Sequence, residues 1–226
     1  MPRKKVLGAV VRHYPLFFDI TGRKCVVVGG GNVAERKVER LLACGAHVEV
    51  VGKSLTPLLA EWKREGKLVH RDADYEGSSL GDAFLVIGAT DDEAVNGQIA
   101  KDARAQGIPV NVVDDPARCD FILPSIVERG DLLIAVSTGG RSPALAKKLR
   151  KELEAAYGPE YAILLEMLGE LRGKVIAGGN PSGENRACFE AVVSSEILDH
   201  IRAKRWRDVK ELILKLTGIK MEVEER

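Results

Sequence analysis

Short runs of apolar residues alternate with longer segments of mixed apolar and polar residues over the first half of the chain. The short runs predict buried strands, and segments in which apolar residues recur every three or four positions predict amphipathic helices. The predicted strands are residues 25–28, 48–51, 68–70, 83–89 and 109–113. The predicted helices between them are residues 33–43, 56–65 and 93–106. Strand–helix alternation at this spacing predicts right-handed βαβ units and a parallel sheet covered by helices on both faces.

The pattern changes beyond Asp114. Two apolar runs, residues 121–126 and 132–137, are joined by the short polar segment 128–131, which is typical of a hairpin or a pair of edge strands. From Ser142 onward the pattern is almost entirely helical, over residues 143–156, 161–172, 184–204 and 206–216. The expected fold is therefore α/β: a Rossmann-type parallel sheet in residues 1–113, a small strand-containing segment in 114–150, and a C-terminal helical domain in 151–226.

A glycine-rich loop follows the first predicted strand. Gly29, Gly31 and Ala34 fit the pattern G-x-G-x-x-[G/A], with a strand before and a helix after. In this setting Gly29 allows a tight turn, Gly31 lets backbone approach a pyrophosphate, and Ala34 permits close helix–strand packing. The helix N-terminus offers free N–H groups and a partial positive charge to the phosphates. The loop therefore predicts a nicotinamide dinucleotide cofactor, although a glycine turn without a ligand has the same sequence.

The residues alone leave the choice between NAD and NADP open. An NAD-specific fold usually places Asp or Glu about 20 residues further on, at the tip of the second strand. Glu49 has nearly the right separation, but it lies within the predicted strand, and the tip carries Lys53 and Ser54. These two side chains could hydrogen-bond a ribose, Lys53 could favour a 2′-phosphate, or Lys53 could be an ordinary solvated lysine.

Two further segments end at the same predicted edge of the sheet. Thr90 follows the strand at 83–89, where small residues leave room for a cofactor, and Asp92 is a natural cap for the next helix. Asp114 comes directly after the last parallel strand, where a carboxylate can accept or relay a proton. Asp115 precedes a proline and is the expected turn residue.

The loop before the helix at 143–156 has the composition of an anion site. Ser142 is a natural N-cap and Pro143 a natural first helical residue. A glycine-containing loop in front of such a helix makes an anion-binding nest, which suits a ligand with several carboxylates. The cations that follow could equally form a solvated helix face. The residues of this predicted site are Ser137, Thr138, Gly139 and Arg141.

Composition excludes several function classes. A formal net charge of +1 gives no general affinity for nucleic acid. No apolar stretch approaches the roughly 20 residues of a membrane span, and the basic start precedes an apolar run too short for a signal peptide. The scattered cysteines predict a reducing cytoplasm, and neither they nor the histidines have metal-ligand spacing, so no metal site is expected.

Four segments, in this order and spacing, resemble the precorrin-2 dehydrogenase / sirohydrochlorin ferrochelatase family, the first module of siroheme synthase. They are YPLFFDITGRKCVVVGGGNVAERKVERLL, GATDDEAVN, NVVDDP and FILPSIVERGDLLIAVSTGGRSPALAKKLR. The resemblance covers about residues 14–150, and beyond them only helicity and length fit. It implies NAD-dependent oxidation of precorrin-2 to sirohydrochlorin and, in some members, insertion of Fe²⁺ to give siroheme.

The resemblance also implies site residues. The essential aspartate falls on Asp114, and dinucleotide contacts fall on Asn32, Val33, Lys53 and Ser54. The resemblance further implies a homodimer whose dimerisation segment is residues 114–150, and a helical domain that helps to cover the tetrapyrrole. In some members a serine that stands where this chain has Thr138 is phosphorylated. The hypothesised partners of the substrate carboxylates are Arg118, Arg129, Arg141 and the nest at 137–140.

Other interpretations remain. A regulatory domain that binds NAD without chemistry would need the glycine loop but not Asp114. A dehydrogenase of a small acid usually needs a His or Lys acid–base, and none stands out. The sequence does not decide between a dehydrogenase and a bifunctional dehydrogenase–ferrochelatase, or between iron and cobalt.

Overall fold

The structure is a computed structural model that describes residues 12–177 and 182–222. The chain divides into two compact units, Met1–Leu123 and Pro124–Arg226. The first unit extends beyond the boundary expected at residue 113, because Phe121 packs against the same core as Val113. The backbone N–H of Asp120 also donates to the carbonyl of Val110, at 2.8 Å.

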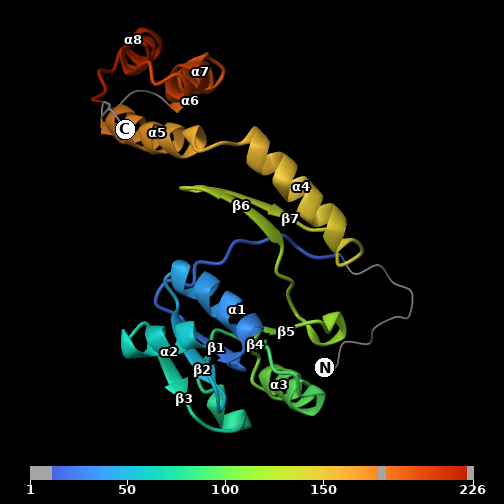
Figure 1. The fold of residues 1–226 in the computed structure, drawn as a ribbon. Coiled ribbons are helices and arrows are strands. Elements are labelled where there is room, and N and C mark those ends of the chain that lie inside the picture. Colours follow the sequence, from blue (N-terminus) through green and yellow to red (C-terminus); the bar gives the residue numbers. More distant parts are fainter. Residues whose placement is uncertain (1–11, 178–181, 223–226) are drawn as a thin grey trace. The chain divides into compact units, whose positions relative to one another are not determined.

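The first unit is a five-stranded parallel sheet with the order β3-β2-β1-β4-β5 (Figure 1). The strands are β1 (Lys24–Val28), β2 (His47–Val51), β3 (Leu68–Arg71), β4 (Leu85–Gly88) and β5 (Val110–Val112). The helices are α1 (Asn32–Ala43), α2 (Pro57–Arg64) and α3 (Glu93–Ala105), with short 3₁₀ turns η1 (Gly77–Ser79) and η2 (Pro116–Arg118). The chain order reverses between β1 and β4, and the carboxyl edge beside such a switch point is where open α/β sheets bind ligands.

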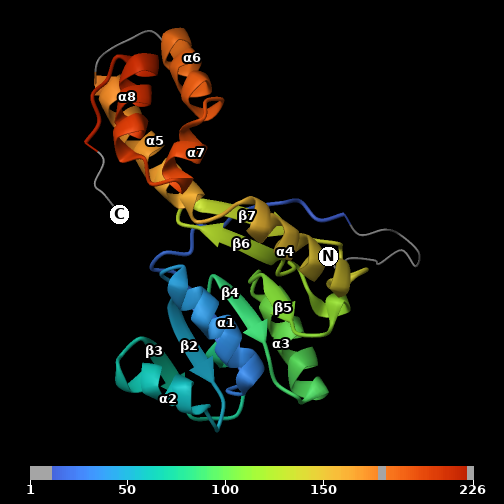
Figure 2. The same ribbon diagram turned by 45° about the horizontal axis from the view of Figure 1, so that its top comes forward.

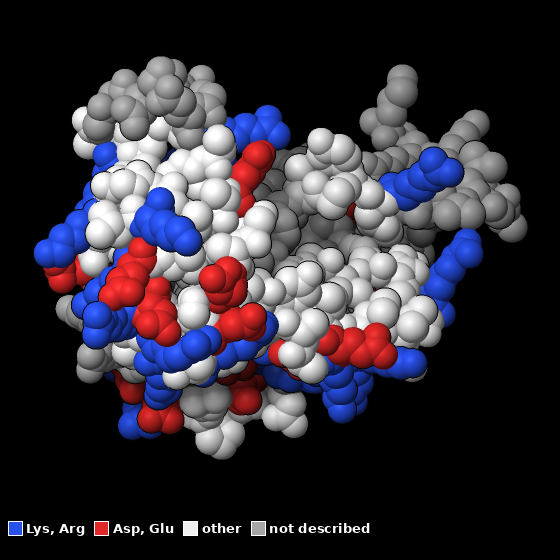
Figure 3. Space-filling view, turned by 90° about the horizontal axis from the view of Figure 1, so that it is seen from above, with Lys and Arg blue, Asp and Glu red and all other residues white. Residues whose placement is uncertain are grey.

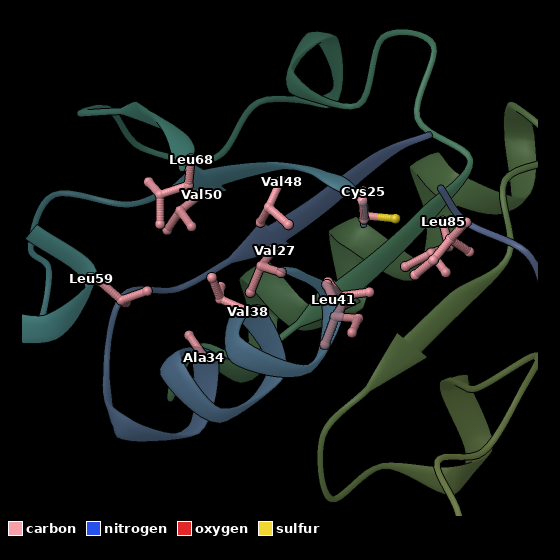
Figure 4. Close-up of a cluster of buried hydrophobic side chains, with 13 residues drawn as sticks. Cys25, Val27, Ala34, Val38, Leu41, Val48, Val50, Leu59, Leu68 and Leu85 are labelled. Carbon is pink, nitrogen blue, oxygen red and sulfur yellow. The ribbon is translucent and has the colours of Figure 1, made fainter. Parts of the chain in front are cut away.

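The two faces of this sheet carry separate cores. On one face, Val27 and Val50 pack against Ala34 and Val38 of α1 and Leu59 of α2, and Figure 4 shows the helical side chains pointing toward those of the strands. Neighbouring strand residues point the other way, so a second cluster forms with α3. Its buried members include Val26, Val28, Val86, Val110, Ile99 and Ala103. Near-continuous apolar strands are what a sheet buried on both faces requires.

The second unit begins with a two-stranded antiparallel sheet. Its strands are β6 (Ser125–Arg129) and β7 (Leu132–Val136), and α4 (Pro143–Ala156) packs against both (Figure 2). The predicted hairpin is confirmed, but the bounds of its first strand, 121–126, are wrong. Phe121 is packed into the first unit's core and its carbonyl accepts a hydrogen bond from Asn111, so the strand starts only after Pro124.

The remaining helices share one core. They are α5 (Glu160–Ala177), α6 (Ser182–Val193), α7 (Ile197–Arg202) and α8 (Trp206–Thr217). The prediction of one continuous helix over 184–204 is wrong, because α6 ends before Ser195. The Ser195 hydroxyl donates to the Val192 carbonyl at 2.7 Å and accepts from the Ile197 N–H at 3.4 Å. A serine that satisfies local backbone groups in this way competes with the helix.

The described surface has mixed character. On the face shown in Figure 3, Lys and Arg side chains are interspersed with Asp and Glu. Among the described residues, none of the helices has both the length and the apolar character needed to cross a membrane.

Candidate functional site

The glycine loop is wedged between the ends of two neighbouring strands. Gly29 has φ +117°, its N–H donates to the carbonyl of Val51 at 2.8 Å, and a Cβ there would lie 2.3 Å from the carbonyl oxygen of Ala89. A Cβ at Gly30 would lie 1.8 Å from the carbonyl oxygen of Ser54. Both positions therefore require glycine for internal packing. The sequence pattern missed Gly30, because its middle positions carry no requirement.

Gly31 is different, because a Cβ there would meet no atom within 4 Å. It is the N-cap of α1, with φ −85° and ψ −175°, and it makes no side-chain capping bond. Asn32 and Val33 form the first turn of this helix, whose leading N–H groups have no intrahelical acceptor. Open space in front of an uncapped helix N-terminus is the geometry that a pyrophosphate needs.

The tip of β2 lies directly against this loop. The N–H of Thr56 donates to the carbonyl of Gly30 at 3.0 Å, which fixes the intervening segment with Lys53 and Ser54 beside the glycines. Lys53 forms an exposed ion pair with Asp74, with 2.6 Å between Nζ and Oδ2. Asp74 belongs to the segment between β3 and η1, and sequence reasoning missed it because no fixed spacing links it to the glycine loop.

Glu49 forms ion pairs within the sheet rather than at the tip of β2. Its carboxylate is 3.1 Å from Lys24 Nζ and 2.8 Å from Arg71 Nη2, and the residue is 8% exposed. A half-exposed arginine and lysine thus neutralise a buried acid within the strand. Glu49 does not reach the tip of β2, which agrees with its position in the sequence.

The end of β4 is held by its own side chains. Thr90 accepts a hydrogen bond from the Asp92 N–H at 3.2 Å, and its carbonyl accepts from the Asn96 amide at 2.8 Å. Asp92 caps α3 by accepting from Ala94 and Val95 at 2.8 and 3.1 Å, as expected from the sequence. Thr90 is half-buried at the same carboxyl edge as the glycine loop.

Asp114 stands just beyond β5, exposed and with φ +60°. Aspartate tolerates this left-handed conformation better than most residues, yet it still costs energy and tends to occur where function requires it. Asp115 is the turn residue, because its carboxylate caps η2 through the N–H groups of Ala117 and Arg118 at 3.0 and 3.1 Å. The turn role predicted for Asp115 is confirmed, while the role of Asp114 stays a prediction.

Cys119 holds this turn through hydrogen bonds of its thiol group. Its thiol donates to the carbonyls of Val112 and Asp115, at 3.2 Å each, and its sulfur accepts from the Val112 N–H at 3.2 Å. Burial raises the pKa of this thiol, so it stays protonated and keeps donating.

A lysine on α1 lies near enough to this carboxylate for the two charges to interact. Lys37 is half-buried, and it lies on the helix between Ala34 and Val38, which share a core with Val113. Burial and the neighbouring Arg36 lower the pKa of Lys37, whereas the charge of Asp114 opposes that shift. The sequence analysis missed Lys37, since only the fold brings α1 beside the end of β5.

The loop at 137–141 lies in the second unit, where its hydrogen bonds are largely internal. The Thr138 hydroxyl donates to the Ser142 carbonyl at 3.1 Å and accepts from its N–H at 3.2 Å, while the Gly139 N–H donates to Ser137 Oγ at 3.1 Å. Ser142 caps α4 through the Leu145 N–H at 3.2 Å, as expected. Arg141 is exposed.

Two of the arginines hypothesised as substrate partners bind other groups of the protein. Arg129 donates to the carbonyls of Tyr157 and Glu154 at 2.9 and 3.0 Å, and so binds the C-terminal end of α4. Arg118 pairs with Asp115 at 2.9 Å. Of the three, Arg141 is the one to which the described contacts assign no such role.

No cluster of three or more metal-ligating side chains occurs within residues 12–177 and 182–222. All four cysteines lie in these ranges and are free thiols. The first unit therefore offers an uncapped helix end, a polar strand tip and an exposed carboxylate at one edge of a sheet.

Two family models match the chain. Residues 16–125 match a family described as NAD(P)-binding, and residues 129–156 match "Sirohaem biosynthesis protein central". The siroheme synthase of Nitrosospira multiformis is 45% identical over 193 residues, which are 84% of this chain and 41% of that protein. The chain belongs to the siroheme synthase family.

Other siroheme synthases match the chain with similar identity and coverage. The siroheme synthase of Methylobacillus flagellatus is 42% identical over 187 residues, covering 83% of this chain and 40% of that protein. The Escherichia coli enzyme is 38% identical over 186 residues, covering 82% and 41%. The chain thus spans about two fifths of the length of these family members.

A solved structure supports the fold. The chain is similar to "SirC, precorrin-2 dehydrogenase" with a TM-score of 0.77 and 24% identity, covering 92% of this chain and 100% of that one. The predicted fold class, a Rossmann-type sheet followed by a small strand-containing segment and helices, is confirmed by this likeness. The NAD(P)-binding domain predicted from the glycine loop is confirmed by the family match.

Proposed function

We propose that this chain is an NAD-dependent dehydrogenase that oxidises precorrin-2 to sirohydrochlorin in siroheme synthesis. The observation that carries the proposal is the pairing of an open, uncapped helix N-terminus at Gly31 with the exposed, left-handed Asp114 at the same edge of one parallel sheet. Similarity to siroheme synthases at 38–45% identity supplies the substrate.

The residues around the glycine loop fit a dinucleotide. The first N–H groups of α1, at Asn32 and Val33, would hold the pyrophosphate, since this helix start has no side-chain cap and a Cβ at Gly31 would meet no atom within 4 Å. Lys53 and Ser54 would contact the adenosine ribose at the tip of β2, and Thr90 would line the path toward the nicotinamide. NAD⁺ supplies the hydride acceptor for the reaction.

Asp114 acts on the proton. Oxidation of precorrin-2 removes a hydride, which bound NAD⁺ would accept, and a proton. The carboxylate of Asp114 accepts or relays the proton, a task that requires an exposed group within reach of the substrate. The charge of Lys37 interacts with that of this carboxylate.

The test compares Asp114→Asn with Asp115→Asn. Each variant removes one negative charge from adjacent positions, but an asparagine at 115 retains the oxygen that caps η2. With precorrin-2 and NAD⁺ under anaerobic conditions, we expect NADH formation to fall about 10²- to 10⁴-fold in Asp114→Asn. Asp115→Asn should stay within a few-fold of the parent chain, and both variants should bind NADH normally.

The same assay separates the catalytic proposal from a regulatory domain that senses NAD. Such a domain would bind NADH but form none from precorrin-2. Equal activity of the parent chain and Asp114→Asn would instead remove Asp114 from the mechanism.

The loop at 137–141 is the proposed binding site for substrate carboxylates. Arg141 would supply a cation, and the backbone of Ser137 and Thr138 would supply N–H donors, in front of α4. The Gly139 N–H is already bonded to Ser137 Oγ. Arg141→Ala should raise KM for precorrin-2 about tenfold with NADH affinity unchanged, because one charge-assisted contact is lost. An unchanged KM would show that Arg141 does not contact the substrate.

Iron insertion is the extension of this proposal to a second reaction. Fe²⁺ would be a substrate, and the four nitrogens of sirohydrochlorin would bind it, so no protein metal cage is needed. Asp114 could accept the pyrrole protons. An anaerobic assay with purified sirohydrochlorin and Fe²⁺ decides between a dehydrogenase and a bifunctional enzyme, and a parallel assay with Co²⁺ decides the metal.

The second unit supports the proposed homodimer. A two-stranded sheet is barely stable alone, and apolar side chains stand exposed on β7 and α4. They are Leu133 (36% exposed), Leu145 (47%) and Leu149 (36%). Light scattering on the parent chain and on Leu145→Glu should give a dimer and a monomer, respectively. The free cysteines fit the reducing conditions of the proposed cytoplasmic location.

A further inference from the structure

The tip of β2 lacks the acidic residue that an NAD-specific site usually carries there. In such folds this acid accepts hydrogen bonds from the adenosine ribose, and its charge opposes a 2′-phosphate. Here the tip is Gly52, Lys53 and Ser54, and the one acid of the strand, Glu49, is buried between Lys24 and Arg71. From the strand alone, the site would favour the phosphorylated cofactor, because Lys53 is a cation.

A carboxylate reaches this tip from another part of the chain. Asp74 Oδ2 lies 2.6 Å from Lys53 Nζ, although Asp74 follows β3 rather than β2. The side chains of Lys53 and Asp74 are 68% and 78% exposed, so the pair stands at the surface where a ligand can approach it. Lys53 is therefore a neutralised cation.

Two neighbouring cations have partners of their own. Arg71 is paired with Glu49, with 2.8 Å between Nη2 and Oε1. Lys63 Nζ lies 3.1 Å from His70 Nδ1, and His70 Nε2 lies 2.7 Å from the carbonyl oxygen of Gly52. This places the ring of His70 between a lysine and the backbone of the tip, while Asp74 is the acid that pairs with Lys53.

We propose that Asp74 makes this site select NAD over NADP, by supplying from the β3–η1 segment the carboxylate that β2 lacks. The inference rests on the proposed function, since it assumes a dinucleotide whose adenosine ribose lies at the β2 tip. Asp74 accepts a hydrogen bond from a ribose hydroxyl, and it repels the doubly negative 2′-phosphate. It also occupies Lys53, which would otherwise pair with that phosphate.

The experiment measures binding rather than turnover. NADH and NADPH are titrated separately into the full chain by fluorescence, and the ratio of their Kd values gives the selectivity. Asp74→Asn should tighten NADPH binding about tenfold and change NADH binding by no more than a few-fold, since a dianion near a unit charge at an exposed site interacts by about that factor. Added salt should shrink the effect through screening.

Asp82→Asn is the matched control. Asp82 is 89% exposed and pairs with Lys24 at 3.4 Å, at the amino-terminal end of β1 and so at the opposite edge of the sheet. The Asp82→Asn substitution removes one negative charge, as Asp74→Asn does, and the ratio of the NADH and NADPH Kd values should stay that of the parent chain. A Lys53→Met change added to Asp74→Asn should reverse the gain in NADPH affinity.

The outcomes separate this inference from the proposed function. Failure of the parent chain to bind either nucleotide would reject the dinucleotide site itself. NADH binding with a Kd ratio that Asp74→Asn leaves unchanged, or that Asp82→Asn changes equally, would overturn the role of Asp74 alone.

Discussion

Replacing Gly31 with alanine should abolish tight dinucleotide binding and leave the fold intact. A Cβ at this position meets no protein atom within 4 Å, and its φ of −85° and ψ of −175° are open to any residue. Loss of a favourable N-cap costs roughly 0.5–1 kcal/mol. The smaller entropy of the unfolded chain offsets this by about 0.4–1 kcal/mol. The two effects nearly cancel, so stability should change by less than about 1 kcal/mol.

The binding cost has a different origin. The added methyl group occupies the space in front of the α1 N-terminus, where the pyrophosphate must come close to the backbone. One lost hydrogen bond to a charged group is worth about 1.5–3 kcal/mol. At 1.4 kcal/mol per factor of ten, the Kd for NADH should rise about 10- to 100-fold.

Gly30→Ala also adds one methyl group, but unlike Gly31→Ala it should destabilise the fold. Its Cβ would lie 1.8 Å from the carbonyl oxygen of Ser54, so one of two backbone segments must move by over an ångström. Overpacking of this kind costs typically 1–3 kcal/mol or more, and we expect a clear loss of stability.

The assay pairs urea unfolding with NADH titration on both variants. The reasoning is refuted if Gly31→Ala binds NADH as tightly as the parent chain, because the open space would then not be the pyrophosphate site. It is equally refuted if Gly30→Ala unfolds at the parent's urea midpoint, because the close approach to Ser54 would then be absent.

Three further predictions concern stability and reactivity. Burial raises the pKa of Cys25 to about 11, so iodoacetamide at pH 8 should modify the exposed Cys44 and reach Cys25 only in urea; equal labelling rates in the native chain, read by peptide mass spectrometry, would contradict this. Gly169 is exposed in α5 with space for a Cβ, so Gly169→Ala should raise the free energy of unfolding by about 0.5–1 kcal/mol in a urea titration, and a lower midpoint would count against it. Burial lowers the pKa of Lys37 below its usual 10.5, so the unfolded chain binds this proton more tightly than the folded chain does. Between the pKa of Lys37 in the folded chain and 10.5, the free energy of unfolding of the parent chain should rise with pH relative to that of Lys37→Met, and parallel pH profiles would refute the burial of this ammonium.

Much of the first unit could be predicted from local patterns. Apolar runs such as 25–28 predict strands, because a strand buried on both faces must be apolar at every position. A cap residue such as Asp92 marks a helix start by accepting from backbone N–H groups, and it does so in the structure. The predicted start of the hairpin and the predicted continuous helix across Ser195 are wrong. Each depends on hydrogen bonds or packing that the neighbouring residues in the sequence do not reveal.

The sequence by itself determined the class of the fold, the glycine loop with its helix, and the turn role of Asp115. These follow from contacts between residues close in the chain, where spacing dictates geometry. Only the tertiary structure decided that Gly30 faces the Ser54 carbonyl, that the charges of Lys37 and Asp114 interact, and that Asp74 pairs with Lys53. Those pairings join elements far apart in the chain, and only the folded sheet brings them together.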